Sequence, residues 1–232
     1  GAGAGGQGEG EARGSGDPSP SAPYRWRATL QAHFGAARCV VACERDLLLS
    51  CGEDGAVKAW SATALARARQ DPQCREESEP FLTCRGHAGA VYALGFGPEE
   101  GVFLSGGQDA VIRAWRLPVP SAGSTLDAAQ PGTGRPAVPC LGNLVGHEDS
   151  IWALCGRART NLLASASADG TIRLWRIPGG TAAAGREEEP SPLLRTFVLP
   201  PLAGESAEVR DVPLALAWLP RAGALLLAGF ES

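Results

Sequence analysis

LLASASADGTIRLW (162–175) aligns without a gap on VFLSGGQDAVIRAW (102–115) and on LLLSCGEDGAVKAW (47–60), and all three stretches end in tryptophan. In each stretch a serine stands ten residues, and an aspartate six residues, before the tryptophan. The three histidines of the 232-residue chain lie 21, 22 and 22 residues before these aspartates. Constant spacing on both sides of the aspartate predicts one structural unit that is repeated three times.

Each unit has the pattern of short β-strands. An apolar run follows each histidine, at residues 39–42, 91–96 and 151–155. The aspartate and its neighbouring Gly or Ala mark a tight turn, and the residues after it alternate apolar and polar side chains, which is typical of a half-buried strand. This alternation divides six side chains between two faces: Val57, Ile112 and Ile172 on one, Lys58, Arg113 and Arg173 on the other.

A further strand is predicted just before each histidine, in residues 27–33, 81–87 and 141–147, which makes four strands per unit. The composition agrees, because 31 glycines and 18 prolines favour turns and short strands over long helices. With 44% hydrophobic residues the chain can bury a core. Residues 1–23 are almost wholly Gly, Ala, Ser, Pro, Glu and Arg, and we expect them to form a disordered tail.

Charge and cysteine content exclude several classes of protein. The net charge is −4 and no block of basic residues stands out, which argues against nucleic acid as a partner. No apolar run approaches the ~18 residues that a membrane span needs, so direct membrane insertion is not expected. Seven cysteines without a C-x-x-C pair indicate reduced thiols. We therefore expect a cytoplasmic protein whose association with membranes, if any, comes through its partners.

The chain has no methionine, even at position 1, so we expect it to be a fragment.

A histidine, then Ser-x-x-x-Asp, then tryptophan, in four-stranded units, resembles the WD40 repeat of β-propellers. The resemblance implies an all-β fold over residues 24–232: an incomplete WD40 propeller with three full four-stranded blades and part of a fourth. The repeats are expected near residues 26–60, 81–115 and 141–175, with a partial one at 193–232 that lacks the histidine. Three and a half blades cannot close into a ring.

In the WD40 family the four residues form a buried, hydrogen-bonded tetrad. The resemblance assigns this structural role to three quartets: His33, Ser50, Asp54 and Trp60; His87, Ser105, Asp109 and Trp115; His147, Ser165, Asp169 and Trp175. Their chemistry suits the role, because an indole only donates, a carboxylate only accepts, and a hydroxyl and a neutral imidazole do both. A break in the chain of bonds should leave buried groups unsatisfied, at about 1–3 kcal/mol each.

Four segments of the sequence resemble the C-terminal WD-repeat domain of the striatin family, the regulatory subunits of protein phosphatase 2A. They are WRATLQAHFGAARCV (26–40), SEPFLTCRGHAGAV (78–91), LVGHEDSIWAL (144–154) and LLLAGFES (225–232). The resemblance implies a non-catalytic scaffold for protein–protein interaction in signalling, with phosphatase 2A and kinase-complex components as partners. Striatins also carry a coiled coil, a caveolin-binding segment and a calmodulin-binding helix, whose heptad and basic amphipathic patterns are absent from this chain.

Two other classes of function stay open. Another WD40 adaptor, such as a ubiquitin-ligase substrate receptor, would have the same blades beside different flanking modules. A propeller enzyme is a third alternative, but His, Ser and Asp recur with a tryptophan in every unit, whereas a catalytic triad is needed once. We therefore predict no catalytic residues and no enzyme activity.

The cysteines and two aromatic residues are the remaining candidates for a metal site and a partner site. Cys39, Cys43 and Cys51 have no usual zinc spacing and are interpreted as small apolar fillers, so no metal and no cofactor is predicted. Tyr92 and Trp152 occupy equivalent positions just after a loop. They are candidates for a partner-binding face, with core packing as the alternative.

Overall fold

The computed structural model describes residues 30, 32–43, 46–63, 65, 79–97, 101–117, 140–157, 160–177, 192–198, 211–219 and 225–231. These residues form fourteen β-strands, listed here in chain order: β1 (Ala37–Cys43), β2 (Leu47–Gly52), β3 (Ala56–Ser61), β4 (Leu82–Arg85), β5 (Val91–Phe96), β6 (Val102–Gly107), β7 (Val111–Arg116), β8 (Cys140–Val145), β9 (Ile151–Gly156), β10 (Leu162–Ser167), β11 (Thr171–Arg176), β12 (Leu193–Val198), β13 (Val212–Trp218) and β14 (Leu226–Glu231).

Every sheet is antiparallel and pairs strands that are consecutive in the chain. β1–β4, β5–β8 and β9–β12 each make a four-stranded sheet, and β13 pairs with β14 alone. The all-β fold with three full blades and part of a fourth is therefore confirmed. The predicted tail at residues 1–23 lies outside the described residues. No helix in the described part of the chain is long and apolar enough to cross a membrane.

The blades are offset by one strand from the sequence units. β4 lies just before His87 and was assigned to the second unit, but it pairs with β3 of the first sheet, with Cys84 opposite Val57. β8 and β12 likewise complete the sheets of the preceding units. The sheets therefore do not coincide with the sequence units, because a strand takes the nearest free sheet edge, which belongs to the unit before it. Each blade thus uses residues of two consecutive repeats.

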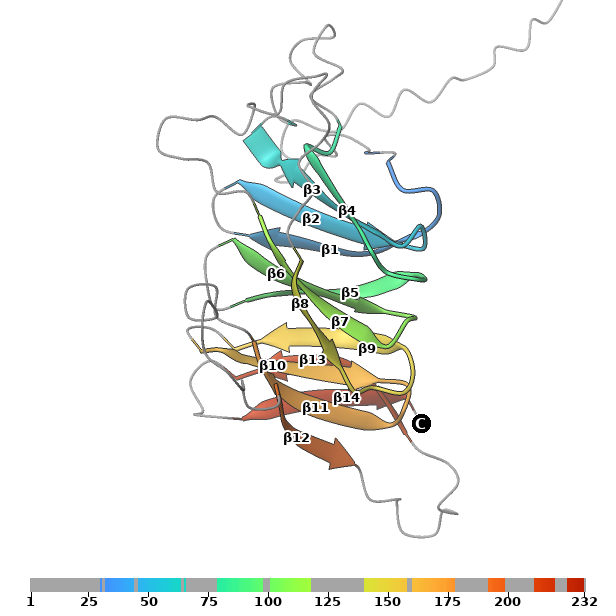
Figure 1. The fold of residues 1–232 in the computed structure, drawn as a ribbon, viewed down its shortest axis with the longest axis vertical. Coiled ribbons are helices and arrows are strands. Elements are labelled where there is room, and N and C mark those ends of the chain that lie inside the picture. The colour runs from blue at the N-terminus through green and yellow to red at the C-terminus, as the bar shows by residue number, and fades with distance from the viewer. Residues whose placement is uncertain are drawn as a thin grey trace, which may run out of the picture.

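The sheets stack face to face in chain order, with β1, β5, β9 and β13 as their inner strands (Figure 1). Buried apolar side chains fill two interfaces between neighbouring blades. One cluster joins the first two blades and includes Leu49, Val57, Phe103 and Trp115. The other joins the second and third blades and includes Leu104, Leu144, Leu163 and Trp175. The core of this protein therefore lies between blades, not inside a single sheet.

The polar face of these strands is more buried than the alternation in sequence predicts. Lys58, on the face opposite Val57, is only 5% exposed. The side chains of Arg113 and Arg173 are 19% and 13% exposed. The half-buried prediction is therefore wrong for β3, whose polar face is buried although Val57 on the other face packs against the second blade. In β7 and β11 the arginines stay partly exposed.

The tight turns after the aspartates differ in one residue. Gly55 and Gly170 have φ values of 69° and 78°, and Ala110 holds the equivalent position at 59°. A side chain at positive φ costs about 1–2 kcal/mol. We expect Ala110→Gly to stabilise the fold, and Gly170→Ala to destabilise it, by about 1 kcal/mol each. Thermal unfolding followed by circular dichroism would test this pair, and shifts in the same direction would contradict it.

Candidate functional site

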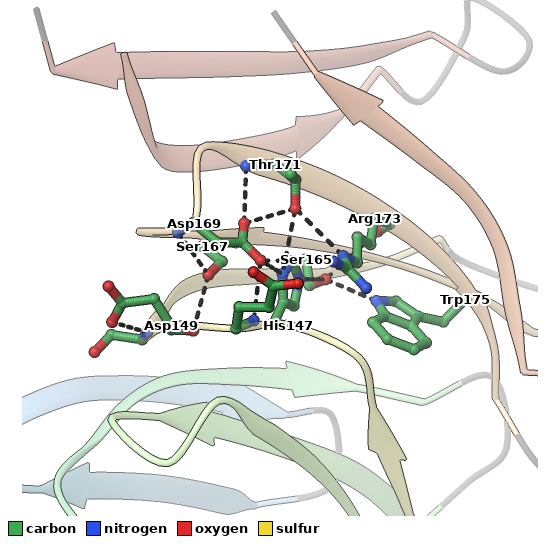
Figure 2. Close-up of polar contacts among 10 residues, drawn as sticks. His147, Asp149, Ser165, Ser167, Asp169, Thr171, Arg173 and Trp175 are labelled. Carbon is green, nitrogen blue, oxygen red and sulfur yellow. Dashed lines mark hydrogen bonds and ion pairs between the residues drawn. The ribbon is translucent and has the colours of Figure 1, made fainter. Parts of the chain in front are cut away.

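The structure brings the four residues of the third quartet together in a continuous chain of contacts (Figure 2). Trp175 Nε1 donates to Ser165 Oγ at 2.7 Å. Ser165 Oγ lies 2.7 Å from His147 Nε2. His147 Nδ1 lies 2.8 Å from Asp169 Oδ2. β9 and β10 with their connecting turns hold three of these groups, and β11 presents the tryptophan to them.

The other two quartets repeat this geometry. In the first, His33 lies 2.8 Å from both Asp54 and Ser50, and Trp60 donates to Ser50 at 3.0 Å. In the second, His87 lies 2.9 Å from Asp109 and 2.7 Å from Ser105, and Trp115 donates to Ser105 at 2.8 Å. The arrangement is the same in all three blades because the spacing of the four residues along the chain is nearly constant.

The direction of the bonds follows from what each group can donate. An ionised carboxylate accepts only, so the histidine Nδ1 must carry the proton and donate to the aspartate. Nε2 then accepts from the serine hydroxyl, and the serine oxygen accepts from the indole. Burial lowers the pKa of His87 and of His147, against the raising effect of Asp109 and Asp169. Both imidazoles are therefore neutral at pH 7.

The three aspartates are ionised and well satisfied. Burial on its own would raise their pKa values, but hydrogen bonds from the histidines and from backbone N–H groups outweigh it and lower the pKa of Asp54 and of Asp109. In Asp169 the hydroxyl of Thr171 adds a further bond, and its pKa falls to about 2. Each carboxylate thus fixes the turn that follows its histidine.

These shifts predict that acid destabilises the protein in two steps. The folded-state pKa values of His87 and His147 lie below 6.5, so the unfolded chain binds protons more readily as the pH falls below that value. The pKa values of the aspartates lie below 3.8, which adds a second loss of stability on further acidification, down to about pH 2 for Asp169. We expect full stability near pH 7 and a fall below it. Urea unfolding between pH 7 and pH 3 measures this, and constant stability down to pH 5 would contradict it.

The third blade has a polar contact that the second blade lacks. Thr171 Oγ1 donates to Asp169 Oδ1 at 2.6 Å and accepts from Arg173 Nε at 3.3 Å (Figure 2). The second blade has Val111 in place of Thr171. Among the described residues, Arg113 Nε is one of two buried side-chain atoms without a hydrogen-bond partner. The hydroxyl of Thr171 thus supplies the hydrogen-bond acceptor that Arg173 Nε has and Arg113 Nε lacks.

We expect Val111→Thr to stabilise the second blade by about 1 kcal/mol, because the new hydroxyl can bond both Asp109 and the unpartnered Arg113 Nε. Thr171→Val is the matched loss in the third blade, with an expected cost of about 1–2 kcal/mol because a bond to a charged group disappears. Urea unfolding of both variants measures the pair. Equal stabilities of the two variants and the parent chain would contradict the expectation.

The quartet also has the order of a serine hydrolase triad, in which serine, histidine and aspartate are linked by hydrogen bonds. Ser105 and Ser165 are fully buried, and each oxygen already accepts a bond from its tryptophan. A nucleophile must reach its substrate, and these hydroxyls cannot. The arrangement therefore suits internal support of the blade.

A different group of side chains lies at the start of the inner strands. Tyr92 and Trp152 stack with ring centroids 4.6 Å apart and planes inclined by 15°. The guanidinium carbon of Arg38 lies 6.0 Å from the Tyr92 centroid, and Arg38 also pairs with Glu53. Trp152 is 38% exposed and belongs to neither core cluster. We call Arg38, Tyr92 and Trp152 the aromatic platform.

Tyr92 and Trp152 of the aromatic platform were predicted from sequence, and Arg38 was not. Arg38, Tyr92 and Trp152 are each the second residue of an inner strand, and each follows a histidine by five residues. That spacing was the available signal for Arg38. Because β1, β5 and β9 lie next to one another, three residues far apart in sequence meet on one surface.

Four-stranded antiparallel blades, each supported by a His–Ser–Asp–Trp quartet, define an incomplete propeller of the WD40 type. The family model described as "WD domain, G-beta repeat" matches residues 25–61, 78–116 and 138–176. The chain belongs to the WD40-repeat family.

Its similarity to striatins, expected from sequence, is confirmed. The chain is 34% identical to human Striatin-3 over 148 residues, which are 63% of this chain and 17% of that protein. It is 30% identical to human Striatin-4 over 205 residues, 88% of this chain and 24% of that protein. It thus spans no more than about a quarter of these relatives. A solved structure, "Structure of U3-55K", shares the fold with a TM-score of 0.50 at 17% identity, over 73% of this chain and 41% of the other.

Proposed function

We propose that this chain is a non-catalytic protein–protein interaction scaffold whose aromatic platform docks partner proteins. WD40 repeats and the similarity to striatins support the class of function. The observation that carries the site is an exposed tryptophan stacked on a tyrosine beside an arginine. Tryptophan, tyrosine and arginine are the side chains that most often dominate binding energy at protein interfaces.

By resemblance to striatins, phosphatase 2A and components of its kinase complex are the proposed partners. The buried serines support the absence of catalysis, because the three Ser–His–Asp arrangements in the described residues have buried hydroxyls that bond their tryptophans. A cytoplasmic location is part of the same proposal.

Binding of the chain to purified phosphatase 2A core enzyme, measured by interferometry, tests the proposal. We expect Trp152→Ala and Tyr92→Ala to weaken binding by about tenfold or more, as for central interface aromatics. Phe197→Ala is the matched control, because Phe197 is 43% exposed and Arg195 lies 5.8 Å from its ring, but it belongs to the outermost strand β12. Equal affinities of the Trp152→Ala and Phe197→Ala chains would contradict the platform. Absence of binding by the parent chain would contradict phosphatase 2A as partner.

A further inference from the structure

Cys39 and Cys51 stand opposite each other in the first blade. They are Cα partners in the antiparallel ladder of β1 and β2. Directly opposite residues of such a ladder have Cα atoms about 4.5 or 5.5 Å apart, and a disulfide spans Cα separations of about 4.4–6.8 Å. Both cysteines are free thiols, and their side chains lie close enough to shift each other's pKa. The two sulfurs can therefore be joined with little movement of the backbone.

The two thiols differ in access. Cys51 is fully buried in the apolar cluster between the first and second blades, whereas Cys39 is half-buried and packs against the margin of that cluster. A small reagent can thus approach Cys39 but not Cys51.

Their acidities differ in the same direction. The hydrogen bond from the Cys51 thiol, with a smaller contribution from the Leu94 N–H, outweighs burial and lowers the pKa of Cys39 to about 6. The pKa of Cys51 is raised, by its bond to Cys39 and then by burial. The thiolate is the attacking form of cysteine. The more accessible member of the pair is therefore also the nucleophilic one.

We propose that Cys39 and Cys51 form a thiol-oxidation site that reacts with low-molecular-weight disulfides such as oxidised glutathione. The Cys39 thiolate attacks one sulfur of the small disulfide, so that a mixed disulfide forms and one glutathione thiolate leaves. Cys51 then loses its proton and attacks the sulfur of Cys39, which releases the second glutathione thiolate. Two protein thiols are oxidised to one cross-strand disulfide, and one glutathione disulfide is reduced to two thiols.

A third cysteine in the same row provides an internal contrast. Cys84 is the Cα partner of Val57, and Val57 is the partner of Cys51. Cys84 thus lies two strands from Cys51, about 10 Å away, which is too far for a disulfide. Burial raises its pKa to about 12, so its thiol stays protonated. The same sheet contains a matched buried cysteine that should not react.

The test exposes the full chain to mixtures of oxidised and reduced glutathione and then alkylates the remaining thiols. We expect one protein disulfide that accounts for two thiols per chain, in addition to any glutathione adduct on the exposed Cys140, and reversal of both by excess reductant. Trypsin cleaves after Arg38, Arg45 and Lys58, so unreduced digests should contain peptide 39–45 joined to peptide 46–58. Tandem mass spectrometry of the linked peptide should place the bond at Cys39, not at Cys43. This experiment uses the parent chain and needs no variant.

Variants sharpen the assignment. Cys39→Ser should abolish the linked peptide, and Cys51→Ser should stop the reaction at a glutathione adduct on Cys39. Cys84→Ser and Cys43→Ser should both leave the cross-link intact. A linked peptide in the Cys39→Ser chain, a bond mapped to Cys43, or a parent chain that forms no protein disulfide at any glutathione ratio would overturn the proposal.

Discussion

Replacement of Trp175 by alanine is expected to destabilise the protein by about 3–5 kcal/mol, the range for loss of a buried aromatic side chain. Trp175 is 1% exposed and packs in the cluster between the second and third blades. The change opens a cavity there. It also takes away the donor that bonds Ser165. Urea unfolding followed by circular dichroism measures the loss.

Two further variants separate packing from hydrogen bonding. Trp175→Phe keeps most of the ring but leaves Ser165 without its indole donor, and we expect a cost of about 1–2 kcal/mol. Thr196→Ala, at an exposed position of β12, should change stability by less than about 0.5 kcal/mol. If Trp175→Phe were as stable as Thr196→Ala, the tetrad would contribute nothing beyond its apolar contacts.

The second large effect is expected at Gly156, the last residue of β9. A Cβ atom there would stand 2.1 Å from the backbone carbonyl oxygen of Phe96, on the neighbouring inner strand β5. Backbone atoms cannot turn aside as a flexible side chain can, so Gly156→Ala must push the second and third blades apart. We expect a cost of about 3 kcal/mol, at the upper end of the usual range for overpacking.

Gly142→Ala is the matched control for this change. Gly142 also lies in a strand, the outer strand β8, but a Cβ there would have no heavy atom within 4 Å. Alanine costs less entropy than glycine in a strand, so we expect a gain of about 0.5 kcal/mol. The same urea titration measures both variants. Similar costs for the two would show that close contact of the inner strands does not limit stability.

Much of the fold could be read from the repeated spacing. The histidine, serine, aspartate and tryptophan of each unit recur at nearly constant intervals, and this predicted three blades and the membership of every quartet. The sheet that β4 joins could not be read from this spacing, because antiparallel pairing depends on which sheet edge is free and not on the boundary of a sequence repeat. The burial of Lys58 was missed for a related reason, since the alternation of one strand does not show what covers its polar face.

The contacts between blades could be identified only from the tertiary structure. Arg38 belongs to the aromatic platform because β1 and β5 lie side by side in the structure. Cys39 and Cys51 were interpreted as separate apolar fillers, and the β1–β2 register made them a pair.

By itself the sequence determined the repeated unit, its turns and the chemistry of its polar quartets, since these depend on residue types at short, regular spacings. The tertiary structure alone decided which strand completes which blade, which polar side chains are covered, and which distant residues meet. Those outcomes depend on sheet edges and on stacked faces. They bring together residues from different repeats, whose separation in sequence carries no signal of their contact.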